Sequence, residues 1–397
     1  MTGVDRVEAA YLAALLDDKT PLFALVKTRL GFLLLDREAA RAVLALMQGG
    51  ALPKADLLSR LTCRGDGARA RAETALRRLA MARASGLGLA GLLRRCLPHG
   101  FSALNTGHSN LTPRMFRRLR AGGAGRIAVL IHDVIPLDYP AFTRPGIAPV
   151  FARKLAAVAH GADLVIHTAE ATRRDTEAHL ARLGRVPPGV VAPLGVTPAA
   201  PAPLPARAAP YFVTIGTIEP RKNHAFLLDL WEEMHKRRPG DEIPHLLILG
   251  QRGWANEALF ARLDRSPLVG RSVFEMGREP DGVVAGLLAG SCGLLFPSFA
   301  EGYGLPPLEA RALGKRVIVP PLPIYRETLG DYPVYLSLSD SYSWMETILN
   351  LGDAARKAAN DEGINGEGEG QTDKSRVGRV AGVPRWEDHF KIVLSLV

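Results

Sequence analysis

The segment from residue 292 to residue 314 constrains the fold of this chain more than any other. It starts with an apolar run typical of a buried strand, continues through a turn with Gly302 and Gly304, and ends in a helix opened by two prolines. Proline suits the first turn of a helix, where its missing N–H would have no partner, and glycine lets the backbone turn sharply beside a ligand. This order of elements is typical of a parallel α/β sheet.

The start of this helix is a predicted anion site. The first N–H groups of a helix have no partner within it, and they favour negative charge. Glu301 lies before the turn and Glu309 lies inside the helix. Carboxylates beside such a site can accept hydrogen bonds from sugar or ribose hydroxyls. An ordinary turn with two solvated glutamates is the alternative interpretation of this segment alone.

A second segment, residues 211–234, has the same order of elements. An apolar strand ends at Gly216, Arg221 and Lys222 follow, and an apolar-periodic helix comes next. Arginine can neutralise a diphosphate bidentately and lysine as a point charge, although a solvated basic pair would explain the two residues if they stood alone. A further strand ends in Gly250. Strands alternating with helices predict a parallel sheet whose ligand crevice lies at the carboxyl ends of the strands.

These motifs resemble the nucleotide-sugar domain of glycosyltransferase family 4. That family has the GT-B architecture, an α/β fold of two Rossmann-like domains facing each other across a cleft. Its pattern is G-x-x-x-P-x-K-N, a later strand that ends in glycine, and P-S-x-x-E-G-[FY]-G-L-P-x-L-E-A, all present within residues 211–340. The first motif is most similar to the mannosyltransferase-like branch. One departure is Thr217, because many members have arginine at that position.

The resemblance implies a retaining glycosyltransferase that moves a hexose, mannose-like or related, from a nucleotide-diphosphate sugar to a glycan or lipid-linked acceptor in cell-surface polysaccharide synthesis. It implies that the donor is bound by Gly216, Arg221, Lys222, Gly250, Gly302, Tyr303, Gly304, Leu305 and Glu309. Of these, Lys222 and Arg221 would bind the diphosphate and Glu309 the ribose, while Glu301 would contact the transferred sugar. No cofactor is implied. The chain has no Asp-x-Asp motif, so nothing points to a catalytic metal ion.

The N-terminal half is predicted to supply the acceptor side of the site. Residues 127–135 read as a strand that runs into a turn, with His132 and Asp133 at its carboxyl end. An H-D-x-x-P step recurs at the catalytic crevice of the branch that this chain resembles, so His132 joins Glu301 as a candidate catalytic residue. A purely structural histidine is an equally good interpretation. Asp133 and Thr168, which follows the next strand, are acceptor-side candidates.

Two further N-terminal segments are open to more than one interpretation. Residues 105–110 form either a substrate loop or a polar surface turn. Residues 2–8 resemble the glycine turn that normally follows the first strand of such enzymes, which makes Gly3 a third acceptor-side candidate. Since no strand is predicted before it, we expect either a truncated first strand or a replacement from another segment.

Length and composition predict two globular domains. A chain of 397 residues exceeds what one core usually supports, and its 47% hydrophobic and 23% charged residues are typical of a globular chain. A stretch with eight prolines, residues 187–210, cannot be a helix. We expect a Rossmann-like acceptor domain without its first strand, a Pro/Ala-rich linker, a donor domain and a helix that returns to the N-terminal domain, at 1–196, 197–210, 211–383 and 384–397. Glycine-rich residues 361–383 are expected to be disordered.

The remaining features concern location and partners. Cys63, Cys96 and Cys292 lack metal-ligand spacing and read as buried thiols, and no signal peptide or membrane span is visible, which together predict a cytoplasmic protein. The formal charge is +10, with nine arginines in residues 59–100. Three interpretations of this arginine excess remain open. It is a surface for peripheral contact with the inner face of an anionic membrane, a result of arginine-rich codon usage in the genome, or an ordinary solvated surface. Nucleic acid is not expected, because no recognition motif accompanies the charge.

Two other functions remain open at this point. A sugar-nucleotide epimerase shares the GT-B architecture but acts on the donor without an acceptor. A catalytically inactive paralogue that binds glycans or acts as a scaffold would be favoured by Thr217 and by the missing first strand. The sequence does not specify the donor base, the acceptor or the oligomeric state.

Overall fold

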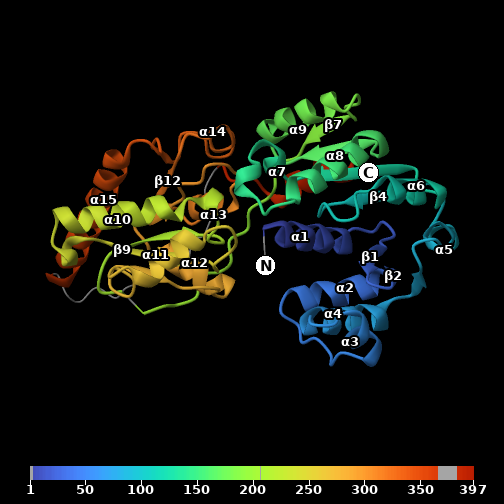
Figure 1. Cartoon of the computed structure of the whole chain (residues 1–397), viewed down its shortest axis with the longest axis horizontal. Coiled ribbons are helices and arrows are strands. Elements are labelled where there is room, and N and C mark those ends of the chain that lie inside the picture. Colours follow the sequence, from blue (N-terminus) through green and yellow to red (C-terminus); the bar gives the residue numbers. More distant parts are fainter. Residues whose placement is uncertain (1–2, 206, 365–381) are drawn as a thin grey trace.

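The computed structural model describes residues 3–205, 207–364 and 382–397. It is an α/β structure in which an N-terminal and a C-terminal half lie next to each other (Figure 1). Buried apolar residues form a continuous cluster across the boundary, since it includes Leu130 and Ile166 of the first half and Val213 and Leu294 of the second. No helix of the described residues is both long enough and apolar enough to cross a membrane.

The C-terminal half contains a six-stranded sheet in the order β10-β9-β8-β11-β12-β13, with every pair parallel. Its strands are β8 (Tyr211–Ile215), β9 (His245–Leu249), β10 (Val273–Glu275), β11 (Gly293–Leu295), β12 (Val317–Val319) and β13 (Val334–Tyr335). This is the strand order of the Rossmann fold. From β8 the chain adds strands first on one side, β9 and β10, and then on the other, β11 to β13, so the direction of the strand order reverses between β8 and β11. Ligands of such sheets bind at the carboxyl ends of the strands beside this reversal.

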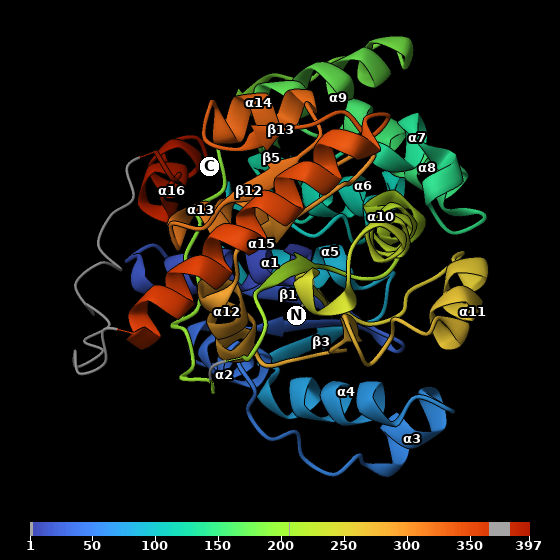
Figure 2. The same ribbon diagram turned by 90° about the vertical axis from the view of Figure 1, so that its left-hand side faces the viewer.

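The helices of this half connect consecutive strands, as the parallel sheet requires, except for the last, which follows β13. They are η2 (Pro220–Lys222), α10 (His224–Arg237), η3 (Gly240–Glu242), α11 (Glu257–Arg265), α12 (Asp281–Gly290), α13 (Leu305–Ala312), α14 (Pro323–Leu329) and α15 (Ser341–Ile364). Figure 2 shows α15 in front of the sheet, where Trp344 packs edge-on against Phe226 of α10 with ring centroids 5.4 Å apart. The expected disorder from residue 361 is wrong for residues 361–364, which continue α15, while residues 365–381 lie outside the described chain.

The N-terminal half contains a four-stranded parallel sheet in the order β4-β5-β6-β7. Its strands are β4 (Ser102–Asn105), β5 (Arg126–Ile131), β6 (Leu164–His167) and β7 (Gly189–Val191). The helices between and after them are α6 (Pro113–Ala121), α7 (Ile135–Asp138), η1 (Pro140–Phe142), α8 (Ile147–Gly161) and α9 (Glu170–Arg182). Strand β4 lies at one edge, because β5 is its only neighbour among the described strands.

A separate antiparallel sheet, β1-β2-β3, precedes this parallel sheet and was not predicted from the sequence. Its strands are β1 (Ala24–Thr28), β2 (Gly31–Leu35) and β3 (Ala82–Ala84), and its helices are α1 (Gly3–Asp17), α2 (Arg37–Met47), α3 (Leu57–Thr62), α4 (Gly67–Leu79) and α5 (Leu89–Cys96). Gly3, expected in a glycine turn, is the first residue of α1. No strand precedes α1 in the part of the chain that the structure describes.

The last helix, α16 (Trp386–Leu394), contacts the N-terminal half. His389 Nδ1 donates to the carbonyl oxygen of Ala192 at 3.0 Å, and its Nε2 accepts from the hydroxyl of Tyr11 at 2.6 Å. Between β7 and β8 the described residues form neither helix nor strand. All three cysteines are free, but only Cys63 is buried, so the expectation of buried thiols is wrong for the partly exposed Cys96 and Cys292.

Candidate functional site

The predicted glycine turns lie at the reversal of the C-terminal sheet. Gly216 follows β8 and has a φ of +136°, a backbone conformation that favours glycine. A Cβ added at Gly250, after β9, would overlap the Gly216 carbonyl group, so the two turns touch. The Gly302–Gly304 turn follows β11, the strand beside β8. The sheet therefore brings together three turns that are far apart in the sequence.

A cluster of four charged side chains occupies this place. Lys222 Nζ lies 2.6 Å from Glu301 Oε1, and Arg221 Nη1 lies 2.8 Å from the same oxygen. Arg221 also pairs through Nη2 with Glu219 Oε1 at 2.7 Å. Glu219 was not predicted from the sequence, although it stands two residues before Arg221 in the same motif. Two cations thus converge on Glu301 in the described structure.

Burial and neighbouring charges act in opposite directions on these groups, and burial lowers the pKa of Lys222 against the attraction of Glu301. Burial raises the pKa of Glu301, but the nearby Arg221 and Lys222 outweigh burial and hold that pKa at about 2. Burial acts to lower the pKa of the Arg221 guanidinium, and the attraction of Glu301 and Glu219 more than compensates, so that the net shift is upward. An arriving diphosphate would therefore compete with an ionised carboxylate for the same two cations.

The predicted helix after the glycine turn is confirmed as α13. Gly304 is its N-cap, with φ +84° and ψ 51°, and no side chain caps the first turn. Pro306 lies in that turn, where it has no N–H to leave unpaired. The helix starts directly after the turn that carries Glu301, so its positive end faces the same region as Arg221 and Lys222.

His132 and Asp133 follow β5, as predicted. The backbone N–H of His132 donates to Nε2 of His108 at 3.1 Å, and Nε2 of His132 donates to the Thr106 carbonyl oxygen at 2.6 Å. Burial lowers the pKa of both imidazoles, that of His108 to about 3. Both rings are therefore neutral at pH 7. Thr168 is fully buried and its hydroxyl is 3.5 Å from the His132 carbonyl oxygen, so it supports the end of β5.

Asp133 reaches the C-terminal half of the molecule. A Cβ added at Gly302 would lie 2.7 Å from Asp133 Oδ2 and 3.0 Å from the His132 carbonyl oxygen. Burial raises the pKa of Asp133, while Arg221 acts in the opposite direction. The acceptor-side and donor-side candidates therefore form one electrostatic group around the Gly302 turn.

Three more contacts join the two halves at this place. The hydroxyl of Tyr303 donates to the Leu194 carbonyl oxygen at 2.8 Å, and Thr172 donates to the Gly302 carbonyl oxygen at 3.1 Å. Arg6 of α1 forms an ion pair with Glu309 of α13. Neither Arg6 nor Thr172 was predicted from the sequence: of residues 2–8 only Gly3 was a candidate, and Thr172 lies outside every motif that was used.

The other candidates are placed as follows. Gly3 lies near Leu305, because a Cβ added at Gly3 would be 3.8 Å from Leu305 Cδ1. The buried ring of Tyr303 is hydrogen-bonded toward the N-terminal half. Within residues 3–205, 207–364 and 382–397, no group of three or more His, Cys, Asp or Glu side chains has the geometry to hold a metal ion.

Comparison with known proteins finds similarity to glycosyltransferases. Residues 209–353 match the family model described as Glycosyl transferases group 1. The serotype-specific mannosyltransferase WbdA of Escherichia coli is 32% identical over 254 residues, which cover 58% of this chain and 31% of that protein. The O-antigen chain mannosyltransferase B of Escherichia coli is 34% identical over 125 residues, or 30% of this chain and 31% of that protein. The chain thus spans less than a third of the length of these relatives.

Solved structures confirm the predicted fold. HepE of Anabaena in complex with UDP-glucose has a TM-score of 0.57 and 16% identity, over 84% of this chain and 90% of that chain. The GtfA/B complex has a TM-score of 0.51 and 16% identity, over 79% of this chain and 61% of that chain. At these identities the likeness concerns the fold, which is the GT-B architecture of two Rossmann-like domains.

Proposed function

We propose that this chain, whose residues 209–353 belong to the glycosyl transferases group 1 family, transfers a hexose from a nucleotide-diphosphate sugar to an acceptor hydroxyl. The proposal rests on one observation: Arg221, Lys222 and the start of α13 lie close together where the strand order of the Rossmann-like sheet reverses, between β8 and β11. Two cations and a helix N-terminus at this place suit a diphosphate leaving group.

The chemistry that we propose is electrostatic. As the bond between the sugar and the diphosphate breaks, negative charge grows on the diphosphate and positive charge on the sugar ring. Arg221 and Lys222 would turn from Glu301 to the diphosphate, which stabilises the departing charge without reorganisation of water. Glu301, freed from the two cations, would accept hydrogen bonds from sugar hydroxyls. In this proposal the protein cations neutralise the diphosphate, so that no metal ion is needed.

We further propose that the reaction retains the configuration at the anomeric carbon through front-face substitution. His132 would then act as a neutral group beside the sugar. Its Nε2–H is already bonded to the Thr106 carbonyl oxygen, so Nδ1 carries the free lone pair and can accept a hydrogen bond from a hydroxyl. Asp133, whose pKa is raised by burial and, to a smaller extent, lowered by the charge of Arg221, would lie on the acceptor side of the same cluster of charged side chains.

The sugar that we propose is mannose, and the acceptor a lipid-linked glycan of the O-antigen type. Two mannosyltransferases of Escherichia coli, the WbdA and mannosyltransferase B proteins described above, support this choice by their sequence identity. Such an acceptor would bring the protein to the cytoplasmic face of a membrane as a peripheral partner.

Incubation of the purified protein with a panel of nucleotide sugars and extracted lipid-linked glycan tests the proposal. We expect a product one hexose heavier than the acceptor, formed from the mannose donor at a rate that excess chelator does not change. The stereochemistry of the new bond, read by proton NMR, tests retention. A rearranged donor in the absence of acceptor would instead identify an epimerase. A lack of both product and donor-induced thermal stabilisation would indicate a scaffold protein.

A further inference from the structure

A hollow with a basic lining lies at the tip of the β1–β2 hairpin, against the start of α6. Figure 1 shows these elements on the side of the N-terminal half that faces away from the C-terminal half, and so away from the candidate donor site. The hollow has two adjoining lobes of about 460 and about 610 Å³. Lys27, Arg29 and Asn110 line both lobes.

The charge of the lining is one-sided. Its cationic side chains are Lys27, Arg29, Arg69, Arg114 and Arg118, and no Asp or Glu belongs to it. Arg69 is paired with Glu73, whose Oε1 lies 3.0 Å from Arg69 Nε. The other four cations have no carboxylate partner among the described residues. Four unpaired positive charges therefore share one concave surface.

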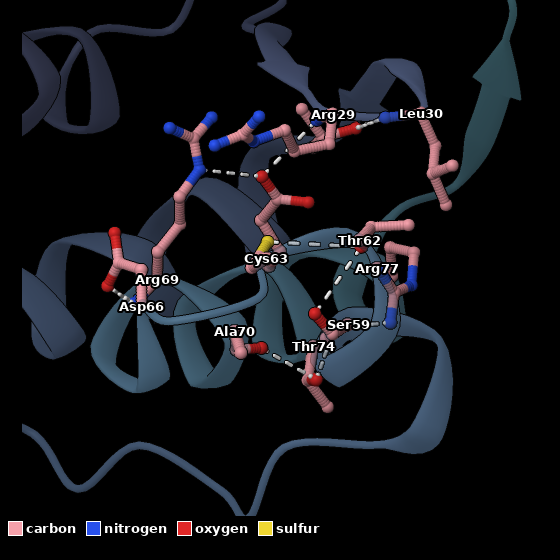
Figure 3. A network of polar contacts seen from close by, with 12 residues as sticks. Arg29, Leu30, Ser59, Thr62, Cys63, Asp66, Arg69, Ala70, Thr74 and Arg77 are labelled. Carbon is pink, nitrogen blue, oxygen red and sulfur yellow. Dashed lines mark hydrogen bonds and ion pairs between the residues drawn. The ribbon is translucent and has the colours of Figure 1, made fainter.

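The hairpin holds its cations in a defined place. Thr28 Oγ1 donates to the Gly31 carbonyl oxygen at 3.3 Å and accepts from the Leu30 N–H at 3.3 Å, which closes the turn. Glu73 Oε1 accepts from the backbone N–H of Arg29 at 3.2 Å as well as from Arg69. Figure 3 shows the side chains of Arg29 and Arg69 directed toward each other. Glu73 thus pairs with the guanidinium of Arg69, while it binds the backbone of Arg29 and leaves the Arg29 guanidinium without a carboxylate partner among the described residues.

The helices behind the hairpin are fixed by their own polar contacts. Arg77 of α4 is buried and binds Asp56 at 2.5 Å and Ser59 at 2.6 Å, and Ser59 in turn bonds to Thr74 at 2.7 Å. Figure 3 shows Arg77, Ser59 and Thr74 on the side of this network away from Arg29. Arg77 therefore serves the packing of α3 on α4, and it does not add to the basic lining.

Helix α6 presents its charge in an arrangement that is unfavourable without a ligand. Arg114 and Arg118 are four residues apart, and like charges at this spacing destabilise a helix. The first turn of α6 also has Arg114 and no acidic residue, although a helix N-terminus favours negative charge. The Arg118 guanidinium rests over Gly86, where an added Cβ would be 3.3 Å from Nη1. An anion bound between Arg114 and Arg118 would relieve their mutual repulsion and would offset the missing negative charge at the start of α6.

We propose that this hollow is a second anion site, which binds the phosphate or diphosphate group of a ligand. Phosphate oxygens accept the paired N–H groups of arginine in a fixed geometry, and a concave surface of one charge raises the local concentration of the opposite ion. A diphosphate fits four unpaired cations better than a single carboxylate does. Lipid headgroups and soluble or glycan-borne phosphate esters present the same chemistry. The proposal does not depend on the donor site.

Footprinting with phenylglyoxal, which modifies free guanidinium groups, tests the site residue by residue on the full chain. We expect inorganic pyrophosphate to slow the modification of Arg29 and Arg114 at least five-fold, as read by mass spectrometry. Arg60 and Arg64 are exposed and lie outside the lining, so they should react at an unchanged rate. Equal protection of all four arginines, or protection of none, would overturn the proposal.

A pair of double variants tests the same site by calorimetry. The variant Arg29→Gln with Arg114→Gln should lose one class of pyrophosphate sites, with binding weakened at least ten-fold, while any binding at the donor site persists. The matched control, Arg60→Gln with Arg64→Gln, should titrate like the unmodified protein. Because the four arginines are exposed and unpaired, both variants should keep the circular dichroism of the unmodified chain. Unchanged binding in the first variant would contradict the assignment.

Vesicles then distinguish the two sources of phosphate. If phosphatidylglycerol vesicles protect Arg29 and Arg114 and displace pyrophosphate, while phosphatidylcholine vesicles do neither, the ligand is an anionic headgroup. If pyrophosphate protects the two arginines and phosphatidylglycerol vesicles do not, the ligand is a soluble or glycan-borne phosphate. Each result supports the anion site and assigns its natural source.

Discussion

Arg6 in helix α1 forms an ion pair with Glu309 in helix α13, so a cation of the N-terminal half holds the carboxylate that is proposed to bind the donor ribose. The side chain of Glu309 is 13% exposed and that of Arg6 is 34% exposed. A ribose that reaches Glu309 must share or replace this contact. The ion pair would thus link the arrangement of the two halves to the occupancy of the proposed donor site.

Replacement of Arg6 tests whether this ion pair competes with the donor. We expect Arg6→Gln to tighten the binding of a nucleoside diphosphate by up to about five-fold, because a partly exposed ion pair contributes up to about 1 kcal/mol that binding no longer has to overcome. Titration calorimetry measures the change. Arg41→Gln, which removes the exposed pair with Glu38, is the matched control. Weaker binding in Arg6→Gln would show that Arg6 itself contacts the donor.

Replacement of Lys222 tests the proposed diphosphate site. We expect Lys222→Ala to lower the rate of sugar transfer about 10²–10³-fold, because a positive charge proposed to stabilise the leaving group is lost. Lys236→Ala, in the last turn of α10, removes an exposed lysine paired with Glu233 at 3.2 Å, and it should leave the rate unchanged. The rate with saturating donor is the measurement. Equal rates in the two variants would refute the assignment of Lys222.

The low pKa of Glu301 predicts a loss of stability in acid. The folded-state pKa of about 2 lies below the ordinary value of 4.5, so the unfolded chain binds this proton first. The stabilisation, on the order of 3 kcal/mol, is complete above pH 4.5 and is lost as the pH falls toward 2. Urea unfolding between pH 6 and pH 2 should therefore show a steeper loss for the unmodified protein than for Glu301→Gln. Parallel curves would contradict this prediction.

The Gly302 turn predicts a requirement for glycine where the two halves meet. An added methyl group would lie 2.7 Å from Asp133 Oδ2 and 3.0 Å from the His132 carbonyl oxygen. We expect Gly302→Ala to cost about 1–3 kcal/mol of stability, since the overlap must be relieved by backbone movement. Gly67→Ala is the control, because nothing lies within 4 Å of its added methyl group. Thermal unfolding of both variants decides whether the overlap is real.

The fold of the C-terminal half was largely predictable because its signals are local. The apolar strands before Gly216 and Gly250, and the helix after Gly304, are specified by neighbouring residues, and the structure has each of them. The antiparallel sheet was not predicted. Its strand β3 spans only Ala82–Ala84 and pairs with β2, although three helices lie between the two strands in the sequence. No local sequence pattern predicts such a pairing.

The candidate site was predicted as a set of residues but not as a set of contacts. The motif identified Arg221, Lys222 and Glu301, yet only the folded chain shows that both cations are bound to Glu301 and that Glu219 shares Arg221. Glu309 was identified without Arg6, which lies 303 positions away in the sequence. No spacing rule reaches over that distance.

The sequence by itself determined the glycine turns, the helix starts and the types of charged group at the sheet reversal, because backbone preferences and periodicity act between residues a few positions apart. Only the tertiary structure decided which charges meet. It brought Arg6 to Glu309, Asp133 to the Gly302 turn, and the hairpin arginine Arg29 into one hollow with Arg114. Such pairs depend on how whole layers of helices and sheets pack, and that packing reflects the burial of apolar surface over the entire chain.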